Sequence, residues 1–240
     1  MKSIRPLEPG IPHMKQNSTL SLTMQAYNKL KGKIVRLQLR PGELLLVQPL
    51  AKELGISRTP VREAMIRLER EGFVEEAEGK KFKVTEITLK SILEIHEIRE
   101  LIELHTVAKA AVHRSQEQMD RLQELAASME RALNKSDHVA FFQTDMDFHS
   151  QIIHIGNNKT LESLMHQLNE KIQRIRHLTT YVHKRIEDTV GEHAAILSAI
   201  GNQDAEAAQK TMKNHLGNVK QGVIHLFQNG AMNYFGGVNL

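Results

Sequence analysis

The stretch ELGISRTPVREA, residues 53–64, decides the fold of the N-terminal part of the chain. Gly55 suits the left-handed residue that ends a helix, and Ser57 suits the N-cap of the next one. The proline three residues later is tolerated because it falls in the first helical turn, where its missing N–H has no partner to lose. The stretch therefore predicts two helices, over about 48–54 and 58–71, joined by a tight turn.

The flanking sequence extends this unit on both sides. Before it, apolar residues at helical spacing predict a helix over about 22–37, which stops at an Arg-Pro-Gly turn. After it, Gly72 closes the third helix, and the segments FVEEA and FKVTEI flank a polar turn at 78–81 with apolar residues alternating at period two. Three helices followed by a β-hairpin form the outline of a winged helix-turn-helix.

The third helix carries residues suited to DNA. Its first turn presents Ser57, Arg58, Thr59 and Arg62, which offer hydroxyls, free backbone N–H groups for phosphates, and guanidinium groups that can pair with guanine in a major groove. Lys80, in the turn of the hairpin, could reach a neighbouring phosphate. The alternative is that these residues form an ordinary solvated face, and their ordered combination favours double-stranded DNA as the partner.

Composition and charge agree with this interpretation. Of 240 residues, 40 % are hydrophobic and 25 % are charged, which is typical of a globular protein with a sizeable core. Residues 1–86 carry 16 Lys and Arg against 10 Asp and Glu, whereas the remainder carries 16 against 18, so the basic surplus lies in front. The absence of a signal peptide or membrane segment predicts a cytoplasmic protein without a membrane partner.

From Thr88 onward the helical pattern is nearly unbroken. It predicts an all-α bundle of six or seven helices, so the fold class is mainly α: a winged helix followed by a helical bundle. The expected helices end near 112, 133, 155, 181, 200 and 227. The expected domains are a flexible arm (1–18), a DNA-binding domain (19–87), an effector-binding and dimerisation domain (88–228) and a flexible tail (229–240).

Three helices of the predicted bundle turn polar side chains inward. Asp145 and His149 lie one helical turn apart in or beside an apolar stripe through Val139, Phe142 and Met146. Histidine also replaces an apolar residue in the seam of each of the last two helices, as His193 in the first and as His215 in the second.

One Asp and three His can converge on a divalent transition metal. Zinc suits this donor set best, and nickel, manganese or iron also suit it. A chain without cysteine offers a metal only imidazole and carboxylate ligands of this kind. The alternative is three separate buried histidines, each hydrogen-bonded to a neighbouring helix. The additional Asp/His pair favours one shared metal site.

The N-terminal motifs resemble a known family. The segments LRPGELL and LAKELGISRTPVREAMIRLEREGFVE, followed by the wing glycine, are similar to the DNA-binding domain of the GntR family of bacterial transcription regulators. The resemblance implies operator contacts at Arg58, Thr59, Arg62 and Gly79. One departure is Glu78, because many members have a basic residue or histidine before the wing glycine, and this weakens the expectation for the wing.

The helical part resembles the effector domain of the FadR-type branch of that family, known as the FCD domain. The resemblance implies a metal site at Asp145, His149, His193 and His215. It also implies a small carboxylate effector bound with the help of Arg99 on the first long helix. Arg99 lies among glutamates there, so a salt-bridge role is equally compatible with the sequence.

Together these features predict a metabolite-responsive transcription regulator that binds a near-palindromic operator as a homodimer. Two alternatives stay open. The metal itself could be the signal, or the Asp/His set could be the site of a metal-dependent enzyme with a DNA-binding head. The enzyme has less support, because the sequence shows no phosphate-binding loop and no nucleophile elbow.

Overall fold

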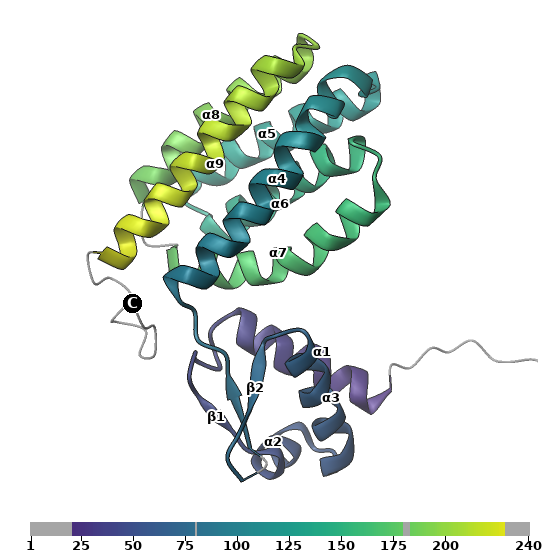
Figure 1. The fold of residues 1–240 in the computed structure, drawn as a ribbon, viewed down its shortest axis with the longest axis vertical. Coiled ribbons are helices and arrows are strands. Elements are labelled where there is room, and N and C mark those ends of the chain that lie inside the picture. The colour runs from purple at the N-terminus through teal and green to yellow at the C-terminus, as the bar shows by residue number, and fades with distance from the viewer. Residues whose placement is uncertain (1–20, 80, 180–182, 229–240) are drawn as a thin grey trace, which may run out of the picture.

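The computed structural model describes residues 21–79, 81–179 and 183–228. The expected arm, the expected tail and Lys80 lie outside these ranges. The described chain is mainly α-helical, with one small sheet in its N-terminal part, and this confirms the predicted fold class (Figure 1). No helix among the described residues is both long enough and apolar enough to cross a membrane.

The N-terminal part, here called the head, is a winged helix. Its elements are α1 (Leu22–Val35), β1 (Leu44–Leu45), α2 (Val47–Leu54), α3 (Arg58–Arg70), β2 (Val74–Ala77) and β3 (Lys81–Val84). Gly55 ends α2 at φ 69°, in the left-handed conformation expected for it. Helix α3 packs on α1 through fully buried side chains, among them Leu30, Ile34, Met65 and Leu68.

The sheet of the head has one strand more than the sequence predicts. Strand β3 lies in the centre and pairs antiparallel with β2 and with the two-residue strand β1. Leu44 and Leu45 are opposite Lys83 and Phe82. The prediction missed β1 because two residues show no alternation, and their strand geometry depends on a partner some forty residues away along the chain.

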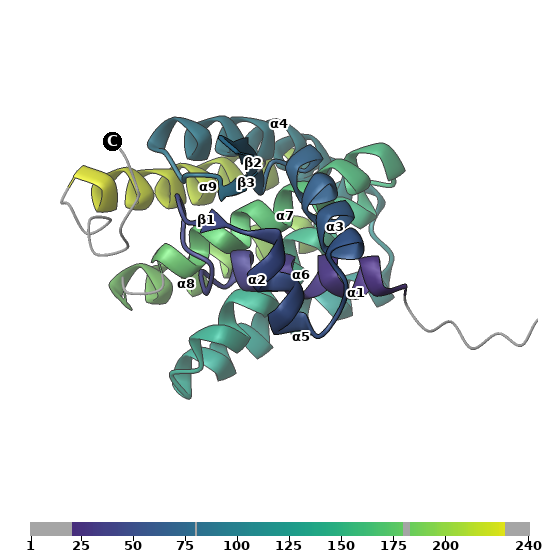
Figure 2. The same ribbon diagram turned by 90° about the horizontal axis from the view of Figure 1, so that it is seen from below.

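The C-terminal part, here called the bundle, has six helices among the described residues. They are α4 (Leu89–His113), α5 (Gln116–Asn134), α6 (His138–Ile155), α7 (Lys159–Thr179), α8 (His183–Gly201) and α9 (Ala205–Gln228). Capping boxes begin two of them, at Thr88 and at Ser115, and satisfy backbone N–H groups that a helix leaves unpaired. Helices α4 and α9 lie side by side in both views (Figures 1 and 2).

The buried face of α6 differs from the stripe that the sequence suggested. Val139 is 76 % exposed, and the core instead takes Phe141, Phe148 and Ile152. Asp145 and His149 are themselves buried, at 4 % and 3 % exposure. The core face of α6 is therefore rotated relative to the predicted stripe, and Val139 with Phe142 and Met146 lies on the side toward the head.

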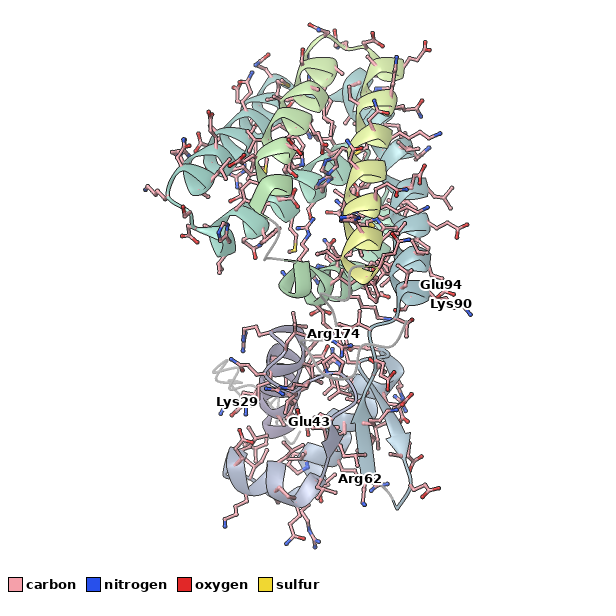
Figure 3. All side chains as sticks on the ribbon, turned by 90° about the vertical axis from the view of Figure 1, so that its left-hand side faces the viewer. Lys29, Glu43, Arg62, Lys90, Glu94 and Arg174 are labelled. Atoms are coloured by element: carbon pink, nitrogen blue, oxygen red, sulfur yellow. The ribbon has the colours of Figure 1, made fainter. Side chains whose placement is uncertain are left out.

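The head contacts the bundle through α7. Lys31 of α1 is buried and forms ion pairs with Glu71 of the head and with Glu170 of α7. Arg174, one helical turn after Glu170, donates to the hydroxyl of Thr85 at 3.0 Å and to its carbonyl at 2.5 Å, just beyond the end of β3. Arg174 lies at the junction of the two parts (Figure 3). Both contacts are charge-assisted, and their cationic partners Lys31 and Arg174 are buried, which makes them stronger than ordinary surface bonds.

Candidate functional site

The predicted DNA-reading residues lie together on the head. Ser57, Arg58, Thr59 and Arg62 are all exposed at the start of α3. Ser57 occupies the N-cap position, but its side chain makes no capping hydrogen bond, so the hydroxyl and the first N–H groups of α3 face outward. Neither arginine forms an ion pair within the described residues, and Arg62 lies on the part of the head away from the bundle (Figure 3). This surface is suited to phosphates and base edges.

The wing turn follows from the strand register. Ala77 pairs with Lys81, and Glu78 and Gly79 are the described residues of the turn between them. Gly79 adopts φ +74°, a conformation that disfavours side chains, so a glycine is needed there. Glu78 is exposed beside it, whereas Lys80 lies outside the described residues. The described wing thus places Gly79 at a sharp turn with an acidic neighbour.

The four predicted metal ligands converge inside the bundle. Asp145 and His149 come from α6, His193 from α8 and His215 from α9, and one donor atom from each lies within 4.8 Å of the others. The Nε2 atoms of His149 and His193 are 3.2 Å apart, and Asp145 Oδ1 lies 3.2 Å from His193 Nε2. Two imidazole nitrogens bound to one tetrahedral zinc ion at about 2.0–2.1 Å are separated by about 3.3 Å, so the donor atoms fit one ion.

Two carboxylates behind the cluster orient its imidazoles. Glu103 of α4 is completely buried and lies 2.5 Å from His149 Nδ1, and Glu192 of α8 lies 2.7 Å from His215 Nδ1. Each carboxylate favours the imidazole tautomer that is protonated at Nδ1, which leaves the lone pair of Nε2 available to a metal. Three features of a metal site therefore coincide: a suitable donor set, buried donors and oriented imidazoles.

Charge balance in the cluster depends on two arginines. Arg176 of α7 forms an ion pair with Asp145 Oδ2, so that Oδ1 is the oxygen facing the histidines. Arg99 of α4 is 3 % exposed and pairs with Glu103, one helical turn away. Arg99 thus has the salt-bridge role that the sequence left open. Arg99 and Arg176 also line one cavity of about 40 Å³.

Burial and charge set the protonation of these groups. Burial, assisted by the neighbouring His215, holds the pKa of His193 well below its ordinary value, and burial lowers the pKa of His215 to about 4 although Glu192 opposes it. Burial acts to raise the pKa of Asp145, but Arg176 and the histidines outweigh it and keep that pKa well below the ordinary value. At neutral pH Asp145 is therefore ionised and His193 and His215 are neutral, the forms that bind metals, whereas Glu103 and Asp145 outweigh burial and raise the pKa of His149.

Sequence reasoning missed Glu103 and Arg176. Both lie on long helices rich in charged residues, where a single carboxylate or guanidinium looks like part of a solvated face. The available signal was helical spacing: Glu103 lies four residues before Val107, and Arg176 lies four residues after Ile172, so each shares a helix face with an apolar residue.

Comparison with known proteins identifies the two parts. Residues 22–84 match the family model described as bacterial regulatory proteins, gntR family, and residues 94–218, more than half of the chain, match the FCD domain. The chain belongs to the GntR family. It is a transcription regulator of that family with a helical FCD effector-binding domain, and the family resemblance seen in the sequence is confirmed.

Alignments with relatives of this GntR regulator cover most of its length. It is 34 % identical over 160 residues to the HTH-type transcriptional regulator McbR of Escherichia coli K12, covering 67 % of this chain and 71 % of McbR. It is 28 % identical over 211 residues to the HTH-type regulator YdhC of Bacillus subtilis 168, covering 88 % and 94 %. The solved structure of E. coli McbR/YncC is similar with a TM-score of 0.71 at 28 % identity, covering 88 % of this chain and 99 % of that one.

Proposed function

We propose that this regulator binds a near-palindromic operator as a homodimer and responds to a small carboxylate held at or near a divalent metal, with zinc the best-suited ion. In this proposal the head (19–87) reads DNA and the helical domain (88–228) binds the effector and the partner subunit. The observation that carries the proposal is the buried Asp145/His149/His193/His215 cluster, whose imidazoles are oriented by carboxylates.

The metal would be held by Asp145 Oδ1 and the Nε2 atoms of the three histidines. These four ligands complete a tetrahedral site, so an incoming water or carboxylate would expand the coordination of the ion to five or more. We assign Arg99 to the carboxylate because it lines the small cavity together with Arg176, so that two guanidinium groups converge there. An acid bound in this way would alter the bundle only if it prefers one of two arrangements of the protein, which is the requirement for control of DNA affinity.

Operator binding is assigned to Ser57, Arg58, Thr59, Arg62, Gly79 and Lys80. The exposed first turn of α3 supports the first four of these. Homodimer formation is supported by α4, where Ile98 and Leu101, three residues apart on one face, are 43 % and 69 % exposed. We expect a dimer by analytical ultracentrifugation, and a shift toward monomer in Leu101→Glu.

The metal site is tested by elemental analysis of the purified protein beside His193→Ala, with His105→Ala, an exposed histidine of α4, as the matched control. We expect about one metal ion per chain in wild type and in the control, and loss of the metal in His193→Ala. Equal metal content in all three proteins would contradict the shared site. Binding to an operator selected from random DNA then reports the response. If metal alone restores DNA binding after chelation, the protein is a metal sensor. A further change in DNA binding on adding a carboxylate supports the proposed effector.

A further inference from the structure

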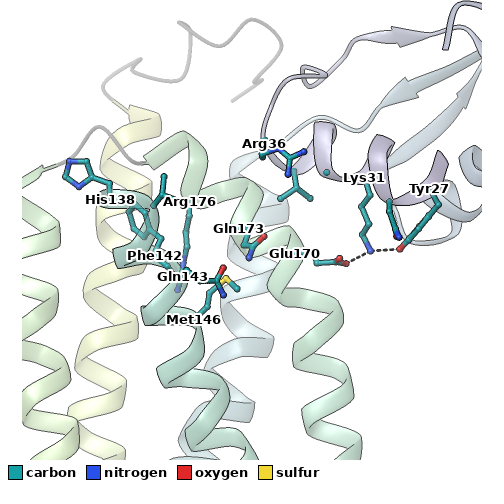
Figure 4. Close-up of a pocket in the computed structure, with 14 residues that line it drawn as sticks. Tyr27, Lys31, Arg36, His138, Phe142, Gln143, Met146, Glu170, Gln173 and Arg176 are labelled. Atoms are coloured by element: carbon teal, nitrogen blue, oxygen red, sulfur yellow. Dashed lines mark hydrogen bonds and ion pairs between the residues drawn. The ribbon is translucent and has the colours of Figure 1, made fainter. Parts of the chain in front are cut away.

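A second cavity lies between the head and the bundle, apart from the histidine cluster. It has a volume of about 470 Å³, within the range of about 300–1,000 Å³ typical of small-molecule sites. One wall is α1 of the head and the other is formed by α6 and α7 of the bundle (Figure 4). Because the two walls come from different parts of the chain, a molecule in this cavity contacts the DNA-binding head and the effector domain at once.

The contacts around the cavity hold its walls together. Lys31 on α1 reaches across to Glu170 on α7 and also donates to Tyr27 at 2.6 Å (Figure 4). The Glu170 carboxylate, the one acidic side chain of the lining within the described residues, is therefore already neutralised. Apart from the Tyr27 hydroxyl and the His138 imidazole, the rest of the lining is apolar, amide or cationic.

The apolar part of the lining includes one strongly exposed side chain. Val139 is 76 % exposed, although it lies next to Phe142, Met146 and Val35 in the same cavity. The aromatic ring and the flexible thioether are side chains that adapt to a planar apolar molecule. A ligand that covers these groups would gain the free energy of burying apolar surface.

The cationic part of the lining includes two arginines, Arg36 at the rim and Arg176 beside the metal cluster. Arg36, the C-cap residue of α1, is exposed and forms no ion pair within the described residues, so its guanidinium is available at the rim. Arg176 borders the cavity on the other side, where it donates to the Phe142 carbonyl at 3.2 Å and pairs with Asp145. It thereby separates this cavity from the metal cluster. The lining thus combines an apolar interior with a free guanidinium, which suits an anion carrying an apolar body.

We propose that this cavity is a second ligand site, for an aryl carboxylate whose ring packs on Phe142 and Met146 and whose carboxylate pairs with Arg36. The site is distinct from the metal-linked effector site and does not depend on a metal. Since α1 and α6 both line it, the ligand binds only the arrangement in which the head is docked on the bundle, and it stabilises that arrangement.

The test uses naphthoate, with the fluorescent dye anilinonaphthalene sulfonate as a reporter that naphthoate displaces. Arg36→Ala removes the anion partner, and Arg40→Ala, an exposed arginine that does not line the cavity, is the matched control. We expect the dissociation constant of naphthoate to rise at least about fivefold in Arg36→Ala and to change less than about twofold in Arg40→Ala.

A second variant tests the cavity by filling it rather than by removing a charged side chain. Gly32 lines the cavity on α1, and a Cβ there would meet only the flexible guanidinium of Arg36, at 2.9 Å. Gly32→Met therefore fills the cavity while improving helix propensity. We expect it to abolish naphthoate binding without lowering the melting temperature.

Hydrogen exchange locates the bound ligand. In wild type, naphthoate should slow exchange in both α1 and α6, and binding should survive in His193→Ala, which removes a proposed metal ligand. Unchanged affinity in both Arg36→Ala and Gly32→Met would overturn the proposal. So would loss of binding in His193→Ala alone, because the ligand would then occupy the metal site.

Discussion

Replacing Glu103 by Gln tests the carboxylate that connects the proposed metal site to the first helix of the bundle. Glu103 is fully buried and accepts from two groups, His149 Nδ1 at 2.5 Å and the Arg99 guanidinium. Glutamine has the same shape, but only one of its two terminal atoms accepts, so one of these donors must face an NH₂ group. The substitution also leaves the buried Arg99 without its counter-ion.

Two magnitudes follow from this geometry. Losing the carboxylate behind a metal-bound histidine typically weakens metal binding about 10- to 100-fold. Removing one partner of a buried ion pair costs about 3–5 kcal/mol, and we expect the lower end because glutamine keeps one acceptor. For a chain of this size, about 3 kcal/mol lowers the melting temperature by roughly 6–12 °C.

The assay measures metal affinity by competition with a chelator of known affinity, and melting temperature by circular dichroism. Glu97→Gln is the matched control, since Glu97 is exposed on the same helix. We expect it to match wild type in both measurements. If Glu103→Gln bound the metal as tightly as wild type while melting earlier, Glu103 would neutralise Arg99 without orienting a metal ligand, and the argument for His149 as an oriented ligand would be refuted.

Three further predictions concern the head, the bundle and their junction. Arg62→Ala should weaken binding to a selected operator about tenfold or more in a gel-shift titration, whereas Arg70→Ala, exposed at the other end of α3, should change it little; equal effects would argue against base contacts by Arg62. Burial, assisted by Arg99, lowers the pKa of His96 to about 4, so the unfolded chain binds a proton below pH 6.5 that the folded chain refuses, and stability falls as pH decreases from 6.5 toward 4. His96→Gln should remove roughly 2 kcal/mol of that loss at pH 5 in urea unfolding, and an unchanged pH slope would contradict the assignment. Glu170→Gln should speed hydrogen exchange in α1 without changing metal content, and unaltered exchange would show that the Lys31 pair does not hold the head.

The head could be predicted because its signals are local. Helix ends depend on residues such as Gly55 and Ser57, whose preferences act within one turn, and the predicted bounds of α1, α2 and α3 agree with the structure to within two residues. The convergence of His193 and His215 was also predictable, since a polar residue that interrupts an apolar seam must face the core. These two signals need no knowledge of which helices are neighbours.

The rest of the site depends on tertiary packing. The face that α6 buries is decided by the helices around it, and a stripe drawn through Val139 is compatible with the sequence but not with the packing. The partners Glu103 and Arg176 are separated by more than thirty residues from the ligands they contact, and no periodicity links them. Their roles follow only from the meeting of α4 and α7 with α6.

Helix α7 shows most clearly why charge patterns alone are ambiguous. Its sequence alternates charged and apolar residues like any solvated amphipathic helix. In the folded chain, however, Glu170 and Arg174 bond to the head, whereas Arg176 bonds to Asp145 in the cluster. Since a helix transmits displacement as a rigid element, a change at Asp145 that moves Arg176 also moves the groups that dock the head. Glu103 joins this chain through His149, whose Nε2 lies 3.7 Å from Asp145 Oδ1. Glu170→Gln and Glu103→Gln therefore perturb opposite ends of one contact chain, and measuring DNA affinity in both, with and without metal, would show whether the two ends are energetically coupled.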